Sequence, residues 1–169
     1  MKPALVLGSG LAGALSVTAF HETIRRLYPK APRLDLLGMQ SLSGLFRKAE
    51  QADPSEKKLF KVALAADVLS NAIFYTLTGI GKPSYVFLRG AVLGLAAGAG
   101  AVMLPKYLGL HEGYSHYATS TKAATVGLYL AGGIITAACM HVFREKKKED
   151  RSQARLCKAA ASMIGFDEE

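Results

Sequence analysis

The sequence predicts an all-α fold: a small polytopic integral membrane helical bundle with four apolar segments, three or four of which span, and an amphipathic helix in the first loop. Half of the 169 residues are hydrophobic and only 20% are charged, which excludes a disordered chain and a disulfide-stapled mini-protein. The apolar residues gather in four long stretches that basic loops separate. These stretches lack the broad polar face of an amphipathic helix in a soluble protein.

The first apolar stretch is long enough to cross a membrane by itself. Residues 3–20 carry no charge over 18 positions, and a hydrocarbon core about 30 Å thick needs roughly 17–20 helical residues. Prolines at 29 and 32 end this helix, so we expect the span at about residues 3–24. A single lysine before an apolar run is also typical of a cleavable leader, but we expect an uncleaved span.

A glycine pattern in this stretch has two interpretations. Gly8, Gly10 and Gly13 match the G-x-G-x-x-G pattern of dinucleotide-binding folds, and Asp35 stands where such folds place an acid. That fold needs a strand before the glycines and a second strand ending at the acid, whereas two prolines precede Asp35. Glycines at this spacing also let helices approach closely in lipid. We therefore expect a helix-packing surface.

The remaining three stretches give spans at about residues 54–81, 84–105 and 120–143. The second span is acceptable only if Asp67 faces protein, and the third only if Arg89 reaches the interface. Residues 1–143 then form a single membrane domain, and residues 144–169 form a basic soluble tail.

The first loop carries signals for two helix starts. Between residues 35 and 49 the apolar positions cover one side of a helix, which is typical of an amphipathic helix in the headgroup layer or under the bundle. Asp53, Pro54 and Glu56 then match an N-cap, first-turn proline and capping-box glutamate. The second span is expected to continue from this capped helix.

Basic residues leave the number of spans open. With four spans the two sides carry 10 and 11 Lys or Arg residues, which gives no positive-inside preference. If the second stretch is re-entrant or interfacial, the split becomes 18 to 3. Charge therefore favours three spans, whereas the length and capping of the second helix favour four. A balanced four-span chain is also able to insert in both orientations and form an antiparallel homodimer.

A basic cluster follows the last span directly. It consists of Arg144, Lys146, Lys147 and Lys148. Such a cluster either anchors the span or binds anionic lipid headgroups, at about 1 kcal/mol per basic residue. No nucleic-acid-binding module is present, so no nucleic-acid partner is expected. The expected partners are the lipid bilayer, further copies of the chain or a larger membrane complex, in a bacterial inner (cytoplasmic) membrane.

The second stretch carries the strongest candidate site. Asp67, Asn71, Tyr75 and Thr78 recur at helical spacing and form one polar stripe. An acid within an apolar span costs a few kcal/mol unless it is paired or protonated, which marks it as a functional candidate. The stripe predicts a substrate or ion path; the alternative is a structural hydrogen bond. The fourth stretch carries a weaker stripe that includes Thr125 and Tyr129.

Histidines and glutamates near the ends of the first and third stretches suggest a metal site, since imidazole and carboxylate suit Zn, Fe or Mn. These candidate ligands are His21, Glu22, His111, Glu112 and His116. The separation of His111 and His116 is one residue longer than the zincin pattern needs. No other cofactor is predicted. We therefore expect a non-enzymatic transporter, channel-like or accessory subunit, and the alternative is a membrane-embedded metal-dependent enzyme.

Overall fold

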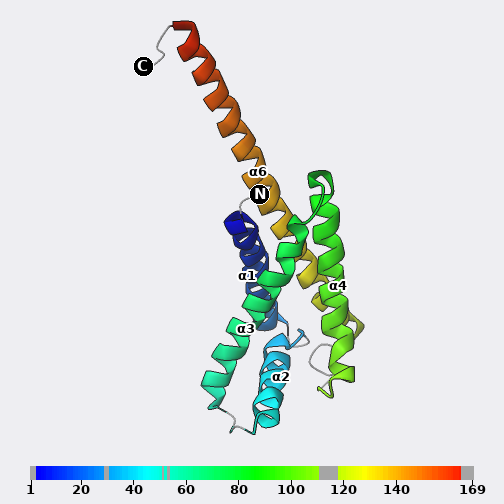
Figure 1. Cartoon of the computed structure of the whole chain (residues 1–169). Coiled ribbons are helices and arrows are strands. Elements are labelled where there is room, and N and C mark those ends of the chain that lie inside the picture. The colour runs from blue at the N-terminus through cyan, green and yellow to red at the C-terminus, as the bar shows by residue number, and fades with distance from the viewer. Residues whose placement is uncertain (1–2, 29–30, 51, 53, 111–117, 165–169) are drawn as a thin grey trace.

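A computed structural model describes residues 3–28, 31–50, 52, 54–110 and 118–164 (Figure 1). The described residues form helices and no strand: α1 (Pro3–Leu27), α2 (Leu34–Lys48), α3 (Glu56–Thr76), α4 (Val86–Tyr107) and α6 (Thr119–Ile164). Two short 3₁₀ turns, η1 (Leu77–Gly79) and η2 (Pro83–Tyr85), connect α3 to α4. The all-helical prediction is confirmed for this part of the chain.

Among the described residues, four helices are long and apolar enough to cross a membrane: α1, α3 with η1, α4 with η2, and the first part of α6. The helix between the first two, α2, matches the expected amphipathic helix to within a residue. Ser55 occupies the N-cap of α3 without a side-chain capping bond, and Asp53, the expected cap, lies outside the described residues. Because α3 is one unbroken helix, it does not double back as a re-entrant segment does.

The four long helices pack in the order α3, α1, α6, α4, with α2 against α3. The start of α1, the η1–η2 connection and the end of α6 lie towards one end of the bundle, and α2 and the start of α3 lie at the other (Figure 1). Helices α3 and α4 diverge from their connection and make few contacts below it. These two helices are therefore held together at their connection rather than along their lengths.

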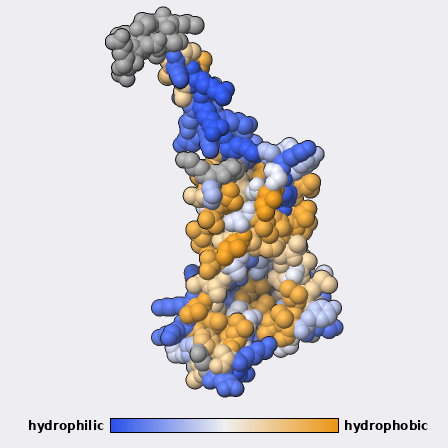
Figure 2. All heavy atoms as spheres, in the orientation of Figure 1, coloured by the Kyte–Doolittle hydropathy of each residue, from blue (hydrophilic) through white to orange (hydrophobic). Residues whose placement is uncertain are grey.

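The interior of the bundle holds polar side chains beside an apolar core, and the outside is largely apolar. The fully buried side chains include hydroxyls on α1 and α6, such as Ser9, Thr125 and Thr136. Large apolar side chains point outward instead, among them Leu15, Ile73, Phe87, Leu95 and Ile134. Figure 2 shows these apolar surfaces as a band over the bundle, with hydrophilic side chains towards its ends.

Glycines set the closest helix contacts. A methyl group at Gly90 or Gly133 would overlap the backbone carbonyl oxygen of the other residue, so α4 and α6 touch backbone to backbone there. Gly10 and Gly13 lie within α1 in the same way, against Ala72 of α3 and Thr136 of α6. The helix-packing interpretation is confirmed for Gly10 and Gly13, whereas Gly8 is exposed and a Cβ atom there would meet nothing within 4 Å. The dinucleotide interpretation is wrong, because the pattern sits inside a helix rather than after a strand.

The connection between α3 and α4 is fixed by a glycine and an arginine. Gly81 has φ of +96°, a left-handed conformation that favours glycine. Arg89 donates from Nε to the carbonyl oxygen of Thr78 at 3.0 Å and from Nη1 to that of Lys82 at 2.8 Å. Arg89 therefore lies at the end of the bundle, the position that the third span requires if it crosses a membrane.

Helix α6 runs on beyond the apolar part of the bundle. Its 46 residues correspond to about 69 Å of helix at 1.5 Å per residue, so the predicted tail begins as a direct continuation of the last span. The basic cluster at Arg144 and Lys146–Lys148 lies on this extension, where Lys148 pairs with Glu145 at 2.7 Å. Its role at lipid headgroups stays a prediction.

Candidate functional site

The predicted polar stripe lies on the inner face of α3. Tyr75 and Thr78 are fully buried and Asn71 is 9% exposed, whereas Asp67 is half-buried. The stripe therefore faces the other helices rather than the outside. Its cavity-lining members, Asp67 and Asn71, lie in the half of α3 nearest to α2. Tyr75 and Thr78 fill the interior of the other half.

The four side chains differ in their hydrogen bonds. The Asn71 amide donates to Asp67 Oδ1 at 3.0 Å, and the Tyr75 hydroxyl donates across the bundle to the Tyr129 carbonyl oxygen at 2.7 Å. The Thr78 hydroxyl is buried without a hydrogen-bond partner among the described residues. Tyr75 is thus a structural link between α3 and α6, and Asp67 is the charged group of the stripe.

These hydrogen bonds predict opposite results for two small substitutions. Tyr75→Phe removes a buried donor and is expected to lower the free energy of unfolding by about 1 kcal/mol. Thr78→Val removes a hydroxyl that has no partner in the described structure and keeps the side-chain shape, so stability is expected to stay equal or rise. Thermal unfolding of both variants in the same detergent measures the difference. Equal losses in the two would contradict the assigned Tyr75–Tyr129 bond.

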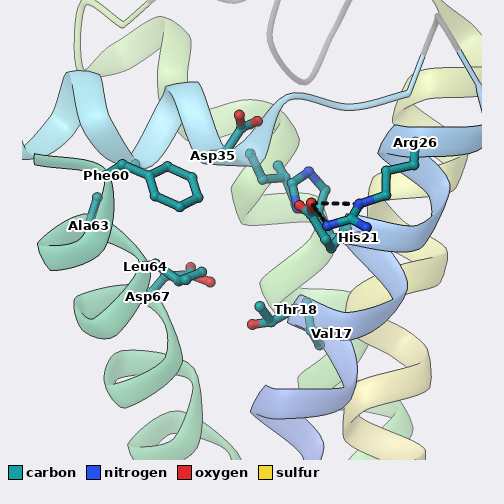
Figure 3. Close-up of a pocket in the computed structure, with 12 residues that line it drawn as sticks. Val17, Thr18, His21, Arg26, Asp35, Phe60, Ala63, Leu64 and Asp67 are labelled. Carbon is teal, nitrogen blue, oxygen red and sulfur yellow. Dashed lines mark hydrogen bonds and ion pairs between the residues drawn. The ribbon is translucent and has the colours of Figure 1, made fainter. Parts of the chain in front are cut away.

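Two cavities meet at Asp67. The first cavity, of about 270 Å³, lies between α1, α2 and α3 and is lined by His21, Glu22, Arg26 and Asp35 besides Asp67. Figure 3 shows Asp67 pointing from α3 into this space, opposite Thr18 and His21 of α1. The second cavity, of about 540 Å³, lies between α3 and α4. Its lining is completed by α2, by Tyr129 of α6, and by Leu108 and Leu110, which follow α4.

The charged groups around the first cavity pair with one another. The Glu22 carboxylate accepts hydrogen bonds from Arg25 and Arg26 at 2.8–3.0 Å, and Asp35 accepts two from Arg33 at 2.9 and 3.0 Å. The second arginine beside Asp35 is Arg25, whose guanidinium lies 3.7 Å from the carboxylate. Burial raises the pKa of Asp35, but the hydrogen bonds and charges of Arg33 and Arg25 outweigh it and hold that pKa below its ordinary value.

The expected metal site is only partly within the described structure. His21 Nε2 donates to the Pro32 carbonyl oxygen at 2.9 Å, and Glu22 is ion-paired, so both side chains already have protein partners. His111, Glu112 and His116 lie outside the described residues. Among the residues that the structure describes, no group of three or more His, Cys, Asp or Glu side chains is arranged to hold a metal ion.

The second cavity has two unlike walls. Helix α3 contributes Asp67, Ser70, Asn71 and Phe74, and α4 contributes only apolar or small residues: Ala96, Ala97, Gly100, Ala101, Leu104 and Pro105. Figure 2 shows the surface hollowed between these helices. Within the described part of the chain, no Lys, Arg or His forms an ion pair with Asp67, and Asn71 supplies its side-chain hydrogen bond.

The sequence singled out Asp67 and Asn71 but not the ion cluster of Arg25, Arg33 and Asp35. Its signal was present, because Asp35 is the one acid between Glu22 and Glu50 and follows several basic residues. Comparison of the chain with known protein families, curated proteins and solved structures found no match. The function is therefore inferred from the geometry of this chain alone.

Proposed function

We propose that the protein is a four-span integral membrane protein of a cytoplasmic membrane. Each of the four long helices has at least 24 residues, which is enough for a hydrocarbon core about 30 Å thick. Their outward faces carry large apolar side chains, such as Leu15, Ile73 and Leu95. Soluble monomers rarely expose continuous apolar patches beyond a few hundred Å², whereas lipid solvates such a surface.

Within the membrane, we propose that the protein binds the cationic group of a small organic ligand at Asp67, as a non-enzymatic carrier or accessory subunit. One observation carries this proposal: Asp67 lies where two cavities meet, without a cationic partner among the described residues. An acid in an apolar environment is costly unless it is paired or protonated, so a carboxylate that stays ionised there needs a cationic partner. A bound cation supplies the missing partner.

The surroundings of Asp67 suit an ammonium group in particular. Phe74 and Tyr129 line the same cavity, and aromatic rings attract cations through their electron-rich faces, by about 0.5–2 kcal/mol. Asn71 orients the carboxylate through its hydrogen bond to Oδ1. Carboxylate and aromatic rings together therefore favour an organic cation over a neutral ligand of the same size.

Helix packing favours a binding site over an open pore within one chain. Beyond Asn71 the described interior is filled by Tyr75 and Thr78, and α1 and α6 contact closely where Gly13 meets Gly132 and Thr136. The accessible volume therefore lies in one half of the bundle and at its side. A carrier or accessory role needs such a site and no continuous channel.

Binding of tritiated tetraphenylphosphonium, a lipophilic cation, tests this proposal. The protein is held in phosphatidylcholine nanodiscs, and binding is measured by equilibrium dialysis. Asp67→Asn keeps the size of the side chain and removes its charge, so we expect the affinity to fall at least tenfold. Asp150→Asn, the same change on the exposed extension of α6, is expected to bind as the unaltered protein does. Equal binding by both variants would overturn the proposal.

A further inference from the structure

The second cavity opens towards the side of the bundle. Helices α3 and α4 are joined at η1 and η2 and diverge below, where they make few contacts (Figure 1). The cavity occupies this gap, and α2 contributes Leu37 and Ser41 to its lining. In a four-span protein this opening faces the acyl chains of the bilayer, so a ligand has access to Asp67 from the lipid phase.

The two walls of this cavity match the two parts of an amphiphile. Most of the polar groups, Asp67, Ser70 and Asn71, belong to α3, with Ser41 on α2. The facing wall on α4 is apolar from Ala97 to Leu104. Asp67 lies six residues after Lys61, the last basic residue before the apolar run of α3, which is about 9 Å along the helix. This depth is close to the end of the span, where the head of a lipid-like molecule resides.

We infer that the ligand is a single-chain amphiphile with an amine or ammonium head, which enters from the bilayer between α3 and α4. Its head pairs with Asp67 and its hydrocarbon chain lies against α4. The volume of about 540 Å³ is within the range of small-molecule sites, roughly 300–1,000 Å³. An uncharged lipid would fill the apolar part of the cavity but leave the carboxylate unpaired. A cationic amphiphile is therefore favoured. This inference rests on the proposed cation binding at Asp67.

Gly100 offers a way to fill the apolar part of the cavity without disturbing the bundle. It lines the cavity, and a Cβ atom there would meet only Leu104, at 3.5 Å, an ordinary contact distance. Gly100→Leu therefore places a side chain where the hydrocarbon chain is expected. Gly127→Leu is the matched control, because a Cβ atom at Gly127 meets nothing within 4 Å and Gly127 faces a different groove, between α1 and α6.

The test measures displacement of tetraphenylphosphonium from nanodiscs by butyltrimethylammonium and dodecyltrimethylammonium. The difference between the two ligands alone does not show a site for the hydrocarbon chain, because the long chain also partitions into the bilayer. The comparison of the two leucine variants distinguishes a chain site from such partitioning. We expect Gly100→Leu to weaken dodecyltrimethylammonium at least tenfold relative to Gly127→Leu. We expect butyltrimethylammonium, which needs only the head site, to change less than threefold.

The outcomes separate this inference from the function on which it rests. Equal displacement by dodecyltrimethylammonium in the two leucine variants would overturn the chain site, and the Asp67 cation site would stand if Asp67→Asn still abolished binding. A loss of both ammonium ligands to the same extent in Gly100→Leu would also overturn the chain site, because the head alone would then account for binding. Binding that survives Asp67→Asn would overturn both proposals.

Discussion

Gly133→Ala is expected to separate α4 from α6 and to lower the free energy of unfolding by about 2–3 kcal/mol. The added methyl group would overlap the Gly90 carbonyl oxygen and lie 3.2 Å from the Cα atom of Gly94. Both are backbone atoms, so no side-chain rotation relieves the overlap and the helices must move apart. The gain in helix propensity from glycine to alanine, about 1 kcal/mol, does not offset that cost.

Gly127→Ala is the internal control for this experiment. Gly127 lies in the same helix, and a Cβ atom there meets nothing within 4 Å. Only the propensity gain remains, so stability is expected to stay equal or to rise by up to about 1 kcal/mol. Thermal unfolding of both variants in one detergent gives the comparison. If the two variants unfolded at the same temperature, the close packing of α4 on α6 would be wrong.

Asp35→Asn is expected to loosen the docking of α2 on the bundle. The Asp35 side chain is 9% exposed and accepts two hydrogen bonds from Arg33, with Arg25 at 3.7 Å. Removing one member of a buried ion pair costs about 3–5 kcal/mol of stability. Because Arg33 is 42% exposed, solvent weakens this pair, and we expect the docking of α2 to lose about 2 kcal/mol. Hydrogen exchange of the α2 amides measures the loss, with Asp150→Asn as the control.

The same ion cluster predicts a pH dependence with a definite sign. Asp35 has a folded-state pKa below its ordinary value of about 3.9, so its contribution is complete above the ordinary pKa and is lost as pH falls through the lower folded-state pKa. Protection of α2 should therefore be constant between about pH 5 and 7 and decline below about pH 4. After correction for intrinsic exchange rates, the α2 amides of Asp35→Asn should show no such loss of protection at low pH. A loss of equal size in this variant would mean that another group causes the pH dependence.

The positions of the helices followed from short-range features of the sequence. The uncharged runs from Pro3 and from Ala123 lie within α1 and α6, and the one-sided apolar pattern around Leu36–Phe46 lies within α2. Helix formation depends on neighbours three and four residues apart, which a sequence displays directly. Asp67 stood out for a similar reason, because an acid inside an apolar run is visible without any knowledge of the fold.

The contacts between helices did not follow from such features. Gly90, Gly127 and Gly133 all lie in apolar helices, and the sequence does not tell them apart. Only the packing of α4 on α6 shows that Gly90 and Gly133 touch. The ion cluster around Asp35 depends in the same way on where α2 docks. These contacts join residues that are distant in the chain, so no local pattern specifies them.

By itself the sequence predicted a helical chain with four apolar segments and a polar stripe that begins at Asp67. In the part of the chain that the structure describes, four helices are long and apolar enough to cross a membrane. Tertiary structure decided which part of that stripe is accessible: Tyr75 and Thr78 are buried between helices, whereas Asp67 lines two cavities. The physical reason is that a cavity is formed by the relative placement of several helices. The divergence of α3 from α4 and the docking of α2 arise from long-range packing, which residue spacing along one helix does not encode.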